Sequence, residues 1–123
     1  PHSSGMLEGK YTADTVFDES DHRSHRPRAW LTNGLKKIEQ LDFLLKVTGG
    51  TLGQAALRYI LKDSEVVSTL PNIYGRDQIE EFVGASDCRD VTAETAARVE
   101  ELFELNYGLP VEQEAATVGG HGR

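Results

Sequence analysis

The sequence predicts an α/β protein that is mostly helical and contributes one short strand to a parallel sheet. Apolar residues recur at helical spacing along much of the chain, and one continuous apolar run, residues 66–70, lies between two helical segments. A helix–strand–helix order with such a run is typical of strands buried on both faces of a parallel sheet. A lone strand cannot satisfy its own backbone groups, so this one requires partners from elsewhere.

Composition sets the class of protein. The chain has 123 residues, of which 38% are hydrophobic and 27% charged, as in a soluble single domain. The formal net charge of −7 argues against binding to nucleic acid or to an anionic membrane. A single cysteine, Cys88, excludes an internal disulfide and fits a reducing compartment. No apolar run approaches the roughly 18 residues of a membrane span, so we expect a cytoplasmic protein.

Two loops and a helix open the chain. Residues 1–11 form a loop with two glycines, where the backbone turns or approaches something closely. Residues 12–31 are polar, and helical periodicity then runs from Asn33 to Val47, where Gly49 and Gly50 end the helix. The polar loop carries a basic cluster: His22, Arg23, His25, Arg26 and Arg28.

Three further helices follow. Thr51 and Gln54 form a capping-box pattern at the start of the second helix. After the strand, a proline-marked loop leads to a third helix at about residues 76–85, and Thr92 caps a fourth. From Val111 onward the sequence is polar and glycine-rich, and we expect a flexible tail.

The carboxyl end of the predicted strand is the first candidate site. Ligands gather at this end of the strands in parallel α/β proteins, and the loop 71–75 with the helical turn after it lies there. Periodicity alone leaves a second interpretation equally open, in which Gln78, Glu80 and Glu81 are a solvated helix face.

Four passages carry a resemblance to a known family. They are Pro1-His2-Ser3-Ser4-Gly5-Met6-Leu7-Glu8-Gly9-Lys10-Tyr11-Thr12, Asp21-His22-Arg23, Gly50 to Leu61, and Leu70-Pro71 to Glu81. Together they resemble the carboxyl-terminal third of an aldo/keto reductase, one of the NADPH-dependent (β/α)8-barrel carbonyl reductases. The first is similar to the segment after the seventh barrel strand, commonly Pro-Leu-Ala-x-Gly-Leu-Leu-Thr-Gly-Lys-Tyr. The third and fourth resemble the seventh barrel helix and the eighth strand with its adenosine-phosphate loop.

The resemblance implies an organisation and a function. Residues 1–110 would be the carboxyl-terminal part of a barrel, an incomplete domain, and residues 111–123 a flexible tail. This part would bind the cofactor of a reductase that transfers hydride to aldehydes or ketones, with NADPH as the expected cofactor and NADH possible. Its partners would be the cofactor and the remainder of the barrel, or another chain that supplies strands.

The resemblance also implies cofactor-binding residues. Ser4, Gly5 and Lys10 occupy positions that wrap the pyrophosphate, and Arg23 lies near the adenosine end, where its donors suit a 2′-phosphate.

Gln78 and Glu81 match positions that bond the adenine and ribose. Asn72 and Tyr74 stand in the loop after the proline, where the family often has Gly or Lys and then Ser or Arg. Phe82 replaces a family asparagine that bonds the adenine, while Arg76 is near enough to compensate for the missing phosphate ligand. Together these departures weaken the case for 2′-phosphate selectivity and leave NADH use open.

No catalytic residue is expected in this chain. The family's catalytic Asp, Tyr, Lys and His lie on the first half of the barrel, and the four tyrosines here do not match by position. Two other functions remain open: a truncated, non-enzymatic relative that binds nucleotide or protein, and a self-contained helical interaction protein. The Asp21-His22-x-x-His25 pattern lacks the helix that would set its histidines on one face, so a solvated loop is favoured over a metal site.

Overall fold

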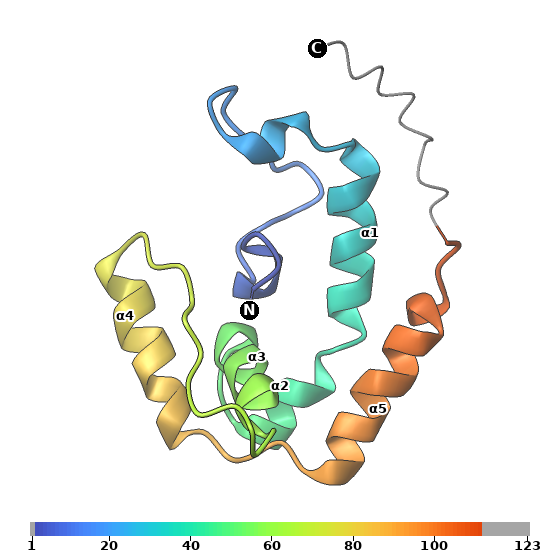
Figure 1. The fold of residues 1–123 in the computed structure, drawn as a ribbon. Helices are drawn as coiled ribbons and strands as arrows, with labels where there is room; N and C mark the ends of the chain where they lie inside the picture. The colour runs from blue at the N-terminus through green and yellow to red at the C-terminus, as the bar shows by residue number, and fades with distance from the viewer. Residues whose placement is uncertain (1, 112–123) are drawn as a thin grey trace, which may run out of the picture.

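The computed structural model describes residues 2–111, and the chain there is helical. Figure 1 shows α1 and α4 on opposite sides, with α2 and α3 between them and the amino-terminal segment enclosed by the helices. The helices are α1 (Arg28–Glu39), α2 (Phe43–Thr48), α3 (Leu52–Leu61), α4 (Arg76–Val83) and α5 (Ala93–Glu104). Short 3-10 turns are η1 (Met6–Glu8), η2 (His22–His25), η3 (Gly84–Asp87) and η4 (Asn106–Gly108). The tail expected over 111–123 lies outside the described residues except for Val111.

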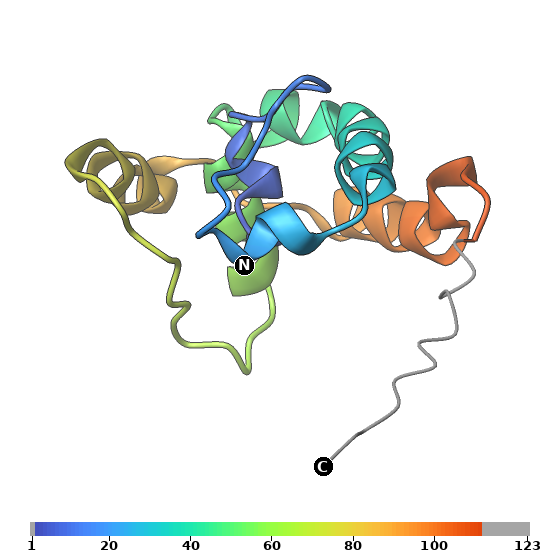
Figure 2. The same cartoon turned by 90° about the horizontal axis from the view of Figure 1, so that it is seen from above.

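The strand predicted at residues 66–70 is not formed in this structure: no β-strand occurs within residues 2–111. The segment lies in a long connection between α3 and α4 that swings away from the helices in Figure 2. Two of its apolar side chains face solvent, Val67 at 93% and Leu70 at 90% exposure. A strand exists only where a neighbour pairs with its N–H and C=O groups, and the described residues supply no such neighbour.

The first predicted helix is two helices. It starts earlier than expected, because α1 begins at Arg28, directly after Pro27, which stands at the N-cap and offers no side-chain cap. Short-range bonds then close the helix, with Leu41 N–H donating to Ile38 O at 2.8 Å. The break between α1 and α2 lets Leu41 and Leu44 both turn inward, at 8% and 4% exposure.

The predicted helix starts at Thr51 and Thr92 are confirmed. The Thr51 hydroxyl accepts the Gln54 N–H at 3.2 Å, and Gln54 Oε1 accepts the Thr51 N–H at 3.0 Å, which completes the capping box of α3. The Thr92 hydroxyl accepts the Thr95 N–H at 3.2 Å and caps α5.

Two small apolar clusters hold the helices together. Leu41, Leu44 and Ala55 join α2 to α3, and partly buried residues of η1 and α5 pack around them. Leu57 and Phe82, with Ala85, join α3 to α4 and η3. Because η1 contacts both α1 and α3, the amino-terminal loop is fixed from two sides. No helix within residues 2–111 has the length and apolar character to cross a membrane.

Candidate functional site

The amino-terminal loop has an unusual left-handed backbone. Ser3, Ser4 and Gly5 have φ of 50°, 57° and 86°, and η1 follows at once, with the Met6 N–H donating to Ser3 O at 3.2 Å. A Cβ built at Gly5 would lie 2.4 Å from the hydroxyl oxygen of Tyr11. A side chain at this position would therefore be strained by the backbone conformation and would force the Tyr11 side chain to shift.

His2 anchors this loop to two helices. It is 6% exposed, its Nε2 donates to the Gly53 carbonyl of α3 at 3.0 Å, and its ring stacks on Phe82 of α4. The two ring centroids are 4.6 Å apart with an interplanar angle of 21°. Positions 2 and 82 are two places where the chain departs from the resembled pattern, which has Leu and Asn there, and the structure puts them in contact.

Arg23 of η2 braces the other side of the loop. It forms a bidentate pair with Asp21, with Nε–oxygen distances of 2.9 and 3.1 Å, and donates to the Tyr11 hydroxyl and to Ser4 O. The Tyr11 hydroxyl also donates to Ser4 O at 2.8 Å. The guanidinium group also lies over the ring of Phe17, 4.8 Å from its centroid. Arg23 thus links η2 to the backbone of the loop.

This network perturbs its titratable groups. Hydrogen bonds from Arg23 hold the pKa of the Asp21 carboxyl well below its usual range, and the same bonds raise the pKa of Arg23. Burial raises the pKa of Tyr11, and the nearby Arg23 charge opposes that rise. The tyrosine therefore stays neutral at physiological pH and can both donate and accept a hydrogen bond.

The end of the connection before α4 forms a wall that faces the amino-terminal loop. Gln78, 2% exposed, accepts the backbone N–H groups of Tyr74 and Gly75 at its Oε1, the latter at 3.1 Å. Its Nε2 donates to Glu8 Oε1 at 3.0 Å, across 70 residues of sequence. Gln78 thereby ties this wall to the amino-terminal loop.

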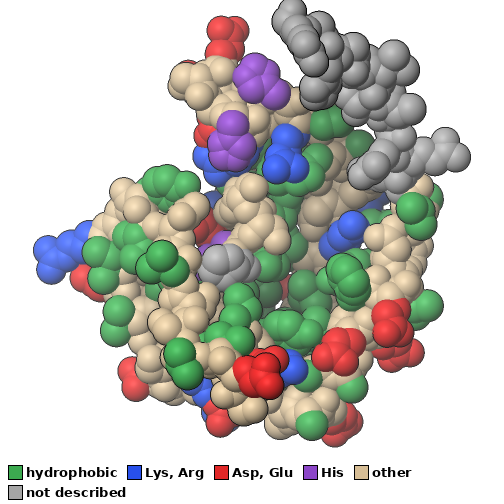
Figure 3. Space-filling model, in the orientation of Figure 1, with side chains coloured by type: hydrophobic (Ala, Val, Ile, Leu, Met, Phe, Trp, Pro, Cys, Tyr) green, Lys and Arg blue, Asp and Glu red, His purple; other side chains and the backbone are tan. Residues whose placement is uncertain are grey.

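Between these walls lies a cavity of about 180 Å³. Five of the eight predicted cofactor residues line it, from segments far apart in the sequence: Ser4, Gly5, Arg23, Asn72 and Tyr74. His2, Ser3, Glu8 and His22 complete the lining. Figure 3 shows histidine, lysine and arginine side chains gathered over the η2 region, whereas acidic side chains gather over α5. The cavity offers hydroxyl, amide and guanidinium donors and one carboxylate, a donor set suited to the sugar and phosphate groups of a nucleotide.

Three predicted residues lie outside the lining. Gln78 does not line the cavity itself but contacts the lining residue Glu8. The Lys10 Nζ lies 3.9 Å from Asp77 Oδ2 at the exposed start of α4. The Glu81 carboxylate accepts the Thr51 hydroxyl at 2.6 Å, so that side chain faces the start of α3.

Sequence reasoning missed Glu8 and His2. The only signal for Glu8 is its position in the amino-terminal passage, where the resembled pattern has Thr. Within residues 2–111, no group of three or more His, Cys, Asp or Glu side chains is arranged to hold a metal ion.

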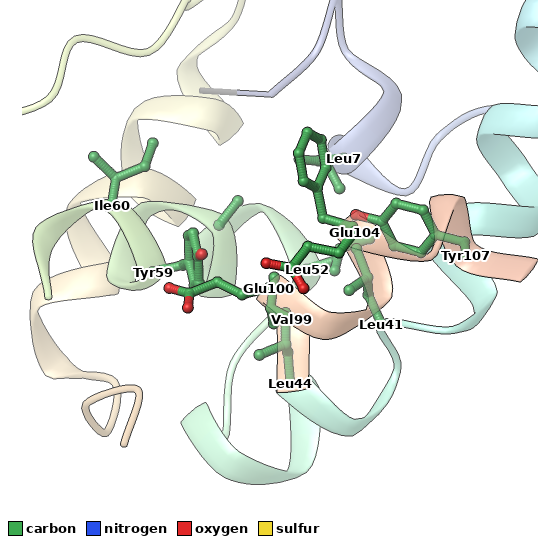
Figure 4. A pocket seen from close by; sticks show the side chains of 12 residues that line it. Leu7, Leu41, Leu44, Leu52, Tyr59, Ile60, Val99, Glu100, Glu104 and Tyr107 are labelled. Carbon is green, nitrogen blue, oxygen red and sulfur yellow. The ribbon is translucent and has the colours of Figure 1, made fainter. Parts of the chain in front are cut away.

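A second, apolar cavity lies between α5 and the α2–α3 pair. Its volume is about 480 Å³, and Figure 4 shows leucine, tyrosine and isoleucine side chains converging on it. Glu100 and Glu104 of α5 are its ionisable carboxylates. The remaining lining is apolar or aromatic: Leu7, Leu41, Leu44, Leu52, Ala56, Tyr59, Ile60, Val99, Phe103 and Tyr107. Without cationic donors, this groove suits an apolar partner and not a phosphate.

Comparison with known proteins assigns the chain to a family. The sequence profile of the aldo/keto reductase family matches residues 1–104, and the chain belongs to that family. It is 28% identical over 115 residues to an L-glyceraldehyde 3-phosphate reductase of Escherichia coli O157:H7, a match that covers 86% of this chain and 33% of the relative. The same reductase of Escherichia coli strain K12 is 27% identical over the same shares. The chain thus spans about a third of the length of these curated relatives, and no solved structure matches it significantly.

Proposed function

We propose that this chain is the cofactor-binding carboxyl-terminal portion of an NAD(P)H-dependent aldo/keto reductase. The observation that carries the proposal is the 180 Å³ cavity, in which the two segments expected to hold the cofactor meet. Sites that enclose a whole drug-sized ligand measure roughly 300–1,000 Å³. This cavity is therefore sized for part of a dinucleotide, and we assign it to the adenosine-phosphate end of NADPH or NADH.

The chain's own residues bind and orient the cofactor in this proposal. Gly5 lines the cavity without a side chain, so a ligand can approach its backbone closely. Ser4, Asn72 and Tyr74 offer polar groups from the two walls. When bound, the nicotinamide supplies the hydride for an aldehyde or ketone. The catalytic groups would come from the rest of a barrel domain.

The exposed apolar surfaces support a larger folding unit. The side chains of Val67 and Leu70 are almost fully exposed in a segment that has no sheet partner within residues 2–111. The groove beside α5 adds a second apolar surface. We infer that residues 66–70 become a barrel strand when the rest of the domain supplies neighbours, with residues 1–110 as part of that domain.

Calorimetric titration of the 123-residue chain with NADPH and NADH tests the proposal. We expect saturable binding of at least one cofactor, weakened about tenfold or more by Arg23→Ala, because a charge-assisted contact and a brace of the loop are lost together. Arg26→Ala is the matched control, since Arg26 lies over Trp30 and not in the cavity. Absence of saturation with both cofactors at millimolar concentration would rule the proposal out for this chain.

A further inference from the structure

The cavity contains a carboxylate that the expected 2′-phosphate site does not need. Glu8, at the end of η1, is half-buried and lines the cavity together with Arg23 and Tyr74. It stands where the resembled pattern has Thr, a neutral residue. A carboxylate at this place changes which groups the cavity accepts.

The Glu8 carboxylate is held in a defined position. Gln78 Oε1 is occupied by two backbone N–H groups, so its amide nitrogen must face the other way, toward Glu8. That nitrogen donates to Glu8 Oε1 at 3.0 Å. Because Gln78 is almost completely buried, its own rotation is blocked, and Glu8 is aimed by a rigid neighbour.

The nearby cations do not balance this charge. Arg23 is already neutralised by its bidentate pair with Asp21. Lys10 lies 3.9 Å from Asp77 at the exposed start of α4. His22 lies 3.7 Å from Asp21 and is largely exposed. Within residues 2–111, the ion pairs do not include Glu8, so Glu8, Arg23 and its partner Asp21 together carry a net charge of −1 beside the cavity.

We propose that Glu8 determines cofactor choice by accepting a ribose hydroxyl of NADH and repelling the 2′-phosphate of NADPH. The inference rests on the proposed function, since it assumes that the cavity takes the adenosine end of the cofactor. A carboxylate accepts hydrogen bonds from a ribose 2′-hydroxyl, whereas a phosphate monoester carries −1.5 to −2 charge at neutral pH. Close like charges of this size disfavour binding by about tenfold or more. The chain therefore prefers NADH, in contrast to the NADPH expected from the resemblance.

The test compares both cofactors on the 123-residue chain and on Glu8→Gln, by calorimetry. The substitution keeps an oxygen for Gln78 to bond and removes the charge. We expect the wild-type chain to bind NADH about tenfold more tightly than NADPH, and Glu8→Gln to bring the two affinities within about threefold of each other. Glu101→Gln, on the exposed side of α5, is the matched control and leaves the ratio unchanged.

A measurement on the wild-type chain keeps the inference testable even if the Glu8→Gln variant fails to fold. Raising the salt concentration screens the repulsion, so the NADH preference of the wild-type chain should narrow. If both cofactors bind and neither salt nor Glu8→Gln alters their ratio, the role of Glu8 is refuted while the proposed function stands. A wild-type preference for NADPH refutes it equally. If neither cofactor binds, the proposed function itself fails, and the inference with it.

Discussion

Replacement of His2 by alanine tests whether the amino-terminal loop is anchored as the structure indicates. The substitution removes a ring that is 6% exposed, its stack on Phe82 and its hydrogen bond to Gly53 O. The aromatic pair contributes about 0.5–1.5 kcal/mol and the hydrogen bond about 0.5–1.5 kcal/mol. The cavity left behind adds to both terms. We expect His2→Ala to lower the free energy of unfolding by about 2–4 kcal/mol.

The assay is urea unfolding followed by far-ultraviolet circular dichroism, with two comparison variants. His2→Phe keeps the stack and loses only the hydrogen bond, so its cost should be about 1 kcal/mol. His25→Ala changes an exposed histidine of η2 and should alter stability by less than about 0.5 kcal/mol. If His2→Ala costs no more than His25→Ala, the loop is not held by the contacts described, and the cavity beside it has no fixed wall.

Two other substitutions test the loop and its brace. Gly5→Ala should cost about 1–2 kcal/mol, because φ is +86° and the new Cβ would lie 2.4 Å from Tyr11; an unchanged unfolding midpoint in urea would contradict this. Because hydrogen bonds from Arg23 depress the pKa of Asp21 in the folded state, the pair stabilises the fold above the unfolded pKa of about 3.9. That contribution is lost as the pH falls below about 4. The stability difference between the chain and Asp21→Asn should therefore be largest above pH 5 and shrink in acid, and unfolding curves at pH 7 and pH 3 measure it; a difference that grows in acid would reverse the sign of the linkage.

Local signals allowed the helices to be predicted, and non-local pairing accounts for the main failure. The caps at Thr51 and Thr92 depend only on bonds to residues three positions ahead, so their sequence patterns are sufficient. The strand at 66–70 depends on neighbours that residues 2–111 do not contain, so the apolar run, which requires partners from elsewhere, does not form a strand in the described residues. The early start of α1 was missed because the helix follows a long polar loop and its cap is Pro27, which offers no side-chain acceptor.

In the candidate site, too, contacts between residues distant in sequence could not be predicted. Ser4, Arg23 and Asn72, which the family resemblance assigns to cofactor binding, line one cavity although their segments are distant in sequence. The resemblance could not reveal that Gln78 aims Glu8, or that His2 stacks on Phe82, because these contacts join residues 70 and 80 positions apart. Residues that differ from the family pattern can be interpreted only when the structure shows which of them are in contact with one another.

In the proposed function, the cavity between the amino-terminal loop and the connection before α4 binds a nicotinamide cofactor. Titration of the ¹⁵N-labelled chain with NADH, followed by amide chemical shifts, tests this proposal most directly. We expect saturable shifts at Ser4, Gly5 and Glu8 and at residues 72–75, with one common dissociation constant. Shifts confined to the apolar groove around Phe103, or no saturable shifts at millimolar NADH, would contradict the proposal.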